Sequence, residues 1–179
     1  MKKVCVFCGS GAGKDSIYVD RAKALGESLA KHELGLVYGG ASIGVMGAVA
    51  DGCLDAGGKV WGVIPQSIID LEVGHQNLTG LEIVDNMHTR KARMYELSDV
   101  FFALPGGMGT LDELCEIITW AQLGYHQKPC YVVNTNGFFD YLLRHFRKAN
   151  EEGFLSDAHM NLYKEVSSFE EAIADFIKG

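Results

Sequence analysis

Residues 100–114 read VFFALPGGMGTLDEL, and this stretch decides the fold. Its first part, Val100–Leu104, is a fully apolar run of the kind found in a central strand that is buried on both faces of a parallel sheet. Three glycines follow within residues 106–109, and a helix is predicted over 110–123. A buried strand that turns through glycines into a helix is the repeating unit of an α/β protein.

The rest of the chain repeats this alternation. Short apolar runs predict strands over 3–8, 34–38, 59–64, 81–84, 100–104 and 130–133. Apolar residues at helical spacing predict helices over 16–32, 45–56, 87–97, 110–123, 138–150 and 169–177. We therefore expect one α/β domain over residues 1–179, built on a doubly wound parallel sheet.

Glycine clusters follow three of the predicted strands, at 9–13, 39–47 and 106–109. In doubly wound sheets, ligands bind beyond the carboxyl ends of the strands, at the point where the strand order reverses. The three clusters could therefore face one crevice.

Charge and composition exclude some partners. The chain has 179 residues with 16 basic and 23 acidic side chains, a net charge of −7. This balance argues against nucleic acid or an anionic membrane as a partner, because both require a basic surface. A small anion remains compatible, since backbone dipoles can hold a phosphate on an acidic protein.

The lack of a predicted targeting segment and the pattern of cysteines favour the cytoplasm. The start, MKKVCVFCGS, lacks a long apolar core and is predicted to be a strand rather than a signal peptide. No apolar run approaches the roughly 20 residues of a membrane span. The five cysteines are an odd number scattered through apolar segments, so we expect buried free thiols in a reducing cytoplasm.

Several familiar motifs fail in the first loop, CGSGAGKDS. A phosphate-binding P-loop would need a glycine where Cys8 stands and a hydroxyl residue where Asp15 stands, and the dinucleotide pattern would need a third glycine at Lys14. Cys5 and Cys8 lie three apart on a strand, where they would point to opposite faces, so core packing is favoured over a redox pair. The six histidines show no metal-ligand spacing, so no metal or cofactor is expected.

The start of the helix after Val100–Leu104 admits two readings. Thr110 and Glu113 match a capping box, in which the threonine oxygen accepts from the backbone N–H of Glu113 and the glutamate reaches back. A helix start rich in glycine is also a place where backbone N–H groups can hold a phosphate. With a phosphate there, Glu113 would lie one turn further on, beside the ribose of a nucleotide, where a carboxylate suits glycosidic bond cleavage.

A basic segment, Met87-His88-Thr89-Arg90-Lys91, precedes the buried strand. Arg90 could clamp an anionic group or position a leaving base, although an exposed charged helix face would explain the same residues. For Arg93 we favour the exposed face.

The block MHTRKARMYELSDVFFALPGGMGTLDELCEIITWAQLGYHQKP closely resembles the Lonely Guy (LOG) family, whose hallmark is PGGxGTxxE preceded by MHxRK. The resemblance extends to LVYGGASIGVMGAVADGCLDAGGKVWGVIP and LEVGHQNLTGLEIVDNMH, and so covers nearly the whole chain. It implies a Rossmann-like, three-layer α/β/α homodimer that hydrolyses the N-glycosidic bond of nucleoside 5′-monophosphates. Members of this family release adenine or N6-modified, cytokinin-type adenines together with ribose 5-phosphate, and are often mislabelled lysine decarboxylases.

The same resemblance assigns roles to residues by position. Arg90 and Glu113 match the catalytic pair, and Lys91 matches a substrate-contacting lysine. The remaining residues implied to bind substrate are Glu72, Gly107, Met108, Gly109, Thr110, Leu111, Asp112 and Thr119. By residue type alone, Glu72 would be a solvated loop charge and Thr119 a helix-surface residue.

One departure and one alternative stay open. The family is expected to have a serine-rich form after CGS, whereas this chain has Gly11-Ala12-Gly13, which leaves a hydroxyl contact there in doubt. The alternative to hydrolysis is a protein that binds or senses a nucleotide on the same cradle without cleaving it. A purely structural module would explain the capping box but not the glycines, Arg90 and Glu113 together.

Overall fold

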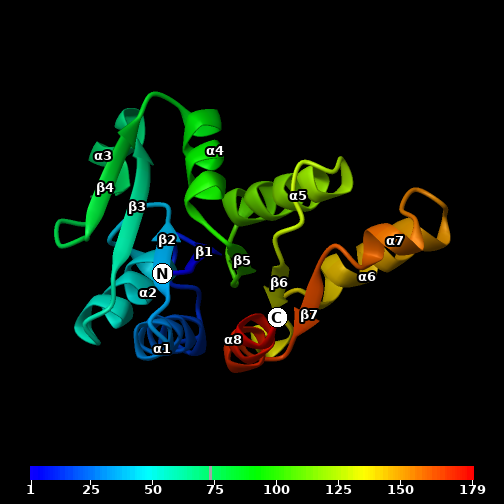
Figure 1. Ribbon diagram of the computed structural model, residues 1–179, viewed down its shortest axis with the longest axis horizontal. Helices are drawn as coiled ribbons and strands as arrows, with labels where there is room; N and C mark the ends of the chain where they lie inside the picture. Colours follow the sequence, from blue (N-terminus) through cyan, green and yellow to red (C-terminus); the bar gives the residue numbers. More distant parts are fainter. Residues whose placement is uncertain (73) are drawn as a thin grey trace.

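The computed structural model describes residues 1–72 and 74–179, apart from the side chains of residues 70–72. In this part of the chain the strands form a single seven-stranded parallel sheet in the order β4-β3-β2-β1-β5-β6-β7 (Figure 1). The strands are β1 (Lys3–Phe7), β2 (Gly35–Tyr38), β3 (Val60–Pro65), β4 (Gly80–Val84), β5 (Val100–Ala103), β6 (Cys130–Val133) and β7 (Lys164–Val166). The expected doubly wound parallel sheet is confirmed.

Helices connect the strands throughout. They are α1 (Ile17–Lys31), α2 (Gly44–Asp55), α3 (Gln66–Glu72), α4 (Met87–Leu97), α5 (Met108–Gln122), α6 (Asp140–Glu151), α7 (Asp157–Met160) and α8 (Phe169–Lys178), with a 3-10 turn at Thr135–Gly137. Every predicted strand and helix is present, with ends that differ by two residues at most.

Three short elements, α3, α7 and β7, were not predicted. A helix of four to seven residues shows too few turns for a periodic pattern. β7 is an edge strand in which only Val166 is buried, so it carries no apolar run.

Two hydrophobic cores explain why the central strands are apolar throughout. Alternate residues of β5 point to opposite faces: Val100 and Phe102 join one core with α1, α2 and α8, and Phe101 and Ala103 join the other with α4, α5 and α6. Figure 1 shows these two helical layers on either side of the sheet. A strand covered on both faces has no solvent side on which a polar residue would be tolerated.

The cysteines follow the same alternation. Cys5 packs in one core and Cys8 in the other, which confirms that they point to opposite faces. The described cysteines are free thiols, and four of them are buried. The expectation of burial is wrong for Cys115, which lies on the exposed side of α5.

The strand order reverses between β1 and β5. The chain runs outward from β1 to β4 in one direction and from β5 to β7 in the other, so the carboxyl ends of β1 and β5 bound the switch point. The two loops that leave these strands touch, because the backbone N–H of Gly9 donates to the carbonyl of Pro105 at 3.2 Å. In the described part of the chain, no helix combines the length and the apolar character needed to cross a bilayer.

Candidate active site

The start of α5 leaves its backbone donors free for a ligand. Gly107 is the N-cap residue, and no side chain that the structure describes caps the helix. The first intrahelical bond runs from the N–H of Leu111 to the carbonyl of Gly107, at 3.2 Å. The N–H groups of Met108, Gly109 and Thr110 come before this bond and have no acceptor within the helix.

The predicted capping box is therefore wrong. It placed Thr110 at the N-cap, but the flexible glycines let the N-cap fall three residues earlier, at Gly107, so that the helix begins at Met108. Thr110 is already inside the first turn, and Glu113 lies one turn beyond it.

The hydroxyl of Thr110 is an unpartnered polar group. Its residue is 2% exposed, and its Oγ1 has no hydrogen-bond partner among the described residues. A buried hydroxyl without a partner costs roughly 1–3 kcal/mol. The oxygen lies against Gly106, where a Cβ would overlap it. The first turn of α5 thus adds a side-chain donor to its free N–H groups.

The start of α2 is different, because the first loop occupies it. The N–H of Val45 donates to the carbonyl of Gly11 at 3.3 Å, and that of Met46 donates to the carbonyl of Gly9 at 3.1 Å. Of these two helix starts beside the switch point, α5 is the one that presents its donors to an anion.

Arg90, on α4, is held by the ends of two strands. It is 6% exposed; its Nε donates to the carbonyl of Val63 at 3.1 Å and its Nη2 to that of Gly39 at 3.2 Å. Its Nη1 contacts only a weak acceptor among the described residues, the sulfur of Met87 at 3.6 Å. A Cβ on Gly39 would overlap Nη2, so the guanidinium needs glycine there. The bonds fix the cation and leave one edge available to a ligand.

Glu113, on α5, is a buried acid near this cation. The residue is 8% exposed, and burial raises the pKa of its carboxyl to about 7, against the attraction of Arg90, which lowers it. Nearby Asp112 raises the pKa further. A carboxyl with a pKa near neutrality is suited to exchanging a proton at physiological pH.

These groups line one cavity of about 180 Å³, which we call the Arg90–Glu113 cavity. The three glycine clusters meet in it, as expected, through Gly9, Gly39, Gly107 and Gly109. Its other lining residues are Val6, Cys8, Ser10, Met46, Met87, Met108 and Thr110. Additional Cβ atoms on Gly107 and Gly109 would meet nothing within 4 Å, so packing does not require glycine there. The open space at these two positions leaves room for a ligand to approach the backbone.

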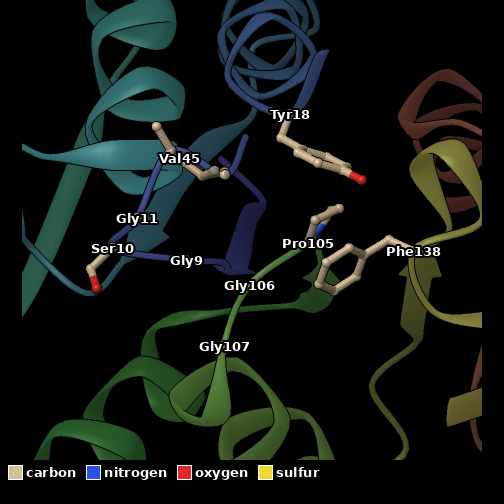
Figure 2. Close-up of a pocket in the computed structure, with 11 residues that line it drawn as sticks. Gly9, Ser10, Gly11, Tyr18, Val45, Pro105, Gly106, Gly107 and Phe138 are labelled. Carbon is tan, nitrogen blue, oxygen red and sulfur yellow. The ribbon is translucent and has the colours of Figure 1, made fainter. Parts of the chain in front are cut away.

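A second cavity of about 330 Å³ adjoins the first (Figure 2). We call it the Tyr18–Phe138 cavity after the two rings that border it. It shares Gly9, Ser10 and Gly107 with the first cavity, and is otherwise lined by Gly11, Ala12, Gly13, Val45, Pro105 and Gly106.

Some residues singled out from the sequence do not reach either cavity. Lys91 forms ion pairs with Asp112 and Glu116 of α5, both at 3.0 Å, and these bonds outweigh burial and raise its pKa. Leu111 is half-buried and packs against the core that contains α4 and α5. Asp112 is exposed apart from its bond to Lys91.

Thr119 and Glu72 also lie apart from the two cavities as described. Thr119 is exposed, and its hydroxyl donates to the carbonyl of Cys115 at 2.7 Å, one turn back along α5. Glu72 ends α3, and its side chain lies outside the described part of the structure. Arg93 is on a solvent-facing side of α4, as expected, where it pairs with Glu82 at 2.8 Å.

Comparison with known proteins identifies the family of the chain. The profile of a family described as "Possible lysine decarboxylase" matches residues 46–176. Cytokinin riboside 5′-monophosphate phosphoribohydrolase LOG5 of Arabidopsis thaliana is 44% identical over 96% of this chain and 75% of its own length. The chain belongs to the LOG family. The cytokinin riboside 5′-monophosphate phosphoribohydrolase of Rhodococcoides fascians is 45% identical over 97% of this chain and 88% of its own length.

Solved structures share this fold. The Moco carrier protein of Chlamydomonas reinhardtii superposes with a TM-score of 0.76, covering 99% of this chain and 96% of that one, at 22% identity. At that identity the likeness concerns the fold alone.

Sequence reasoning missed several residues that line the two cavities. Cys8 and Met46 looked like core residues, and Met87 was noted only as part of a basic segment. Tyr18 and Phe138 gave no signal, because they come from the starts of two distant helical segments that only the fold brings together.

Proposed function

We propose that this protein hydrolyses the N-glycosidic bond of nucleoside 5′-monophosphates, AMP or N6-modified AMP, and releases the free base and ribose 5-phosphate. The observation that carries the proposal is that a buried acid, Glu113, and a buried cation, Arg90, line one cavity beside an uncapped helix start. The names of relatives 44–45% identical over nearly the whole chain support it.

The 5′-phosphate binds at the first turn of α5. The N–H groups of Met108, Gly109 and Thr110 point to it, and the helix dipole adds about half a positive charge. The unpartnered hydroxyl of Thr110 donates a further bond, which removes the cost of burying it unsatisfied. Arg90 also lines the cavity, and its Nη1 adds positive charge.

With the phosphate there, the ribose lies between Glu113 and Arg90. As the bond from C1′ to the base nitrogen breaks, its electron pair leaves with the base and positive charge develops at C1′. The carboxylate of Glu113 stabilises that charge and orients a water molecule for attack on C1′. Overall, water gives its hydroxyl to C1′ and a proton to the base.

Two other activities make different demands on the site. A non-hydrolytic nucleotide binder would use the same phosphate cradle but would leave the nucleotide intact. Lysine decarboxylation by pyridoxal phosphate needs a lysine that forms a Schiff base with the cofactor. Among the described lining residues of the two cavities there is no lysine.

Chromatographic detection of free base across a panel tests the proposal. The panel is AMP, N6-isopentenyl-AMP, GMP and CMP, with lysine as a negative control. We expect free base and an equal amount of ribose 5-phosphate from an adenine nucleotide, and no cadaverine from lysine. Tight binding of AMP without any release of base would favour the non-hydrolytic alternative instead.

We further propose that the protein is a homodimer of single-domain chains, each spanning residues 1–179. Large apolar side chains more than half exposed, Leu123 and Tyr125 after α5 and Tyr141 on α6, support a partner surface there. Thr119 is also exposed and lies one turn before Leu123 along α5, so a second copy seated on Leu123 would lie near it. Size-exclusion chromatography with light scattering measures the oligomeric state directly.

We also propose a cytoplasmic location. Free cysteines, among them the exposed Cys115, support a reducing compartment. Microscopy of a tagged full-length chain tests the location.

A further inference from the structure

Lys91 connects the two helices that carry the buried cation and the buried acid. It directly follows Arg90 on α4, and one of its partners, Asp112, directly precedes Glu113 on α5. Its ammonium lies 3.0 Å from a carboxylate oxygen of Asp112 and 3.0 Å from one of Glu116. Figure 1 shows the two helices beside each other. The ion pairs therefore join the immediate neighbours of Arg90 and Glu113.

We propose that Lys91 is a positioning residue for the reaction. Its ion pairs with Asp112 and Glu116 fix α5 against α4, and so set the width of the cavity in which the ribose lies. Lys91 and Asp112 then touch no substrate, in contrast to the roles that the resemblance to the LOG family implies. The inference rests on the proposed function, because that function places the ribose between Arg90 and Glu113.

The rest of the protein holds the two sides of this link unequally. On α4, Arg90 is anchored by the carbonyls of Val63 and Gly39. The start of α5 follows a glycine-rich turn, and Thr110 in its first turn has no side-chain hydrogen-bond partner among the described residues. Leu114 packs α5 onto the core, but apolar packing is non-directional. The ion pairs supply the directional contact that this end of α5 otherwise lacks.

The geometry of the ion pairs suits a link that fixes position. Asp112 and Glu116 are four residues apart, so their carboxylates lie one turn apart on the same face of α5. An ammonium bonded to both fixes the separation of the helices and also their register along the axis. The side chains of Lys91 and Glu116 are 11% and 22% exposed, so salt screens this pair less than a fully exposed one.

The same charges act on Glu113, which gives positioning a signature of its own. Burial raises the pKa of Glu113 to about 7, Arg90 and Lys91 lower it, and the two acidic partners of Lys91 raise it. Cys8 also lines the cavity, but burial holds the pKa of its thiol well above the usual range, so it stays neutral. Removing Lys91 should move the pH midpoint of the reaction up, and removing the two acids should move it down. A loss of position would lower the rate in both cases.

The test removes each side of the link and then both together. Lys91→Met keeps the apolar stem of the lysine, and the double variant Asp112→Asn/Glu116→Gln keeps the size of both acids. Arg93→Met is the matched control, because Arg93 is also a cation of α4 but pairs with Glu82 of β4. For each variant, with its fold verified by circular dichroism, the rate of adenine release from saturating AMP between pH 5.5 and pH 9.5 gives a midpoint and a plateau kcat.

Lys91→Met and the double variant should each lower the plateau kcat at least about tenfold, because a small misplacement of reacting groups is costly. The midpoint should move up in Lys91→Met and down in the double variant. The triple variant should be no slower than the slower of the two, since the three residues act as one unit. Arg93→Met should stay within about twofold of wild type, as expected for an exposed pair.

Three results would overturn the inference. A loss confined to Lys91→Met would mean that the lysine contacts the substrate. A wild-type plateau kcat in Lys91→Met, with only the midpoint moved, would mean that the charges tune the pKa of Glu113 and do not position it. Losses that multiply in the triple variant would mean that the residues act independently.

A wild-type protein that releases no base would overturn the proposed function but not the link, which calorimetry with AMP then tests. Arg90 and the start of α5 hold the phosphate together, so AMP should bind more weakly to both Lys91→Met and the double variant. Tighter binding to the double variant, as removal of negative charge alone would give, would overturn the link.

Discussion

Replacing Glu113 by glutamine should stabilise the protein relative to wild type by an amount that grows as the pH rises. The amide keeps the size of the side chain and removes the group that titrates. Burial raises the pKa of Glu113 from 4.5 to about 7, so the carboxylate is less favourable in the folded protein than in the unfolded chain. Wild-type Glu113 supports the fold fully below about pH 4.5, and this support is lost as the pH rises through about 7.

The size of the effect follows from these two values. Between pH 5 and pH 8 the linkage relation gives a loss of about 2.5 kcal/mol in the free energy of unfolding of the wild type. Glu113→Gln has no such loss, so its stability relative to wild type should grow by about 2.5 kcal/mol over this range. For a chain of this length that corresponds to a change of roughly 5–10 °C in the difference between the two Tm values.

Urea unfolding of both proteins at pH 5, 6, 7 and 8, followed by circular dichroism, measures the difference. Any effect of the amide that does not depend on pH cancels between the two ends of the range. Glu116→Gln is the control, because Glu116 is on the same helix but pairs with Lys91 and does not line the cavity. A stability difference for Glu113→Gln that stays flat from pH 5 to pH 8 would refute the assignment of a buried, raised-pKa acid.

Three further predictions concern the site. The kcat/KM for AMP should rise with pH to a plateau above about pH 7 as Glu113 deprotonates. The phosphate of AMP itself titrates near pH 6, so its contribution is measured separately, as the pH dependence of ribose 5-phosphate affinity for Glu113→Gln, and is divided out of the profile. A corrected profile that falls through pH 7 would exclude a catalytic carboxylate. Gly109→Ala should raise the free energy of unfolding by about 0.5–1 kcal/mol, and it should weaken AMP binding because the new methyl group enters the open space at the start of α5. Gly39→Ala should instead destabilise the fold, because the new methyl group displaces Arg90. A Gly109→Ala variant with an unchanged KM for AMP would contradict phosphate binding at this position. Thr110→Val should stabilise the ligand-free protein by about 1 kcal/mol and weaken the binding of inorganic phosphate, measured by thermal unfolding and calorimetry; a destabilised valine variant would mean that the hydroxyl has a partner within the protein.

The fold could be predicted from the sequence because the signals are local. The apolar run at 100–104 and the alternation of short strands with periodic helices require a parallel sheet with helices on both faces. The elements that were missed, such as β7, have too few buried residues to produce a pattern. The convergence of the glycine clusters was also predictable, since topology alone places the carboxyl ends of parallel strands at one edge.

The site could be predicted only in part, because tertiary packing decides which side chains reach it. Lys91 follows Arg90 directly in the sequence, yet it turns to α5 and pairs with Asp112, while Arg90 turns inward to two strand carbonyls. Thr110 was predicted to be the helix cap, but Gly107 takes that position, and the buried hydroxyl has no hydrogen-bond partner among the described residues. Tyr18 and Phe138 lie 120 residues apart along the chain, and no spacing rule connects them.

The account depends most on a charged Glu113 at the reacting ribose. Its most direct test is the rate at which free adenine forms from saturating AMP at pH 8, in wild type and in Glu113→Gln, with the fold of each verified. The wild type should release adenine and ribose 5-phosphate in equal amounts, and the glutamine variant should be slower by a factor of about 100 or more. A glutamine variant that releases adenine at the wild-type rate would contradict the account.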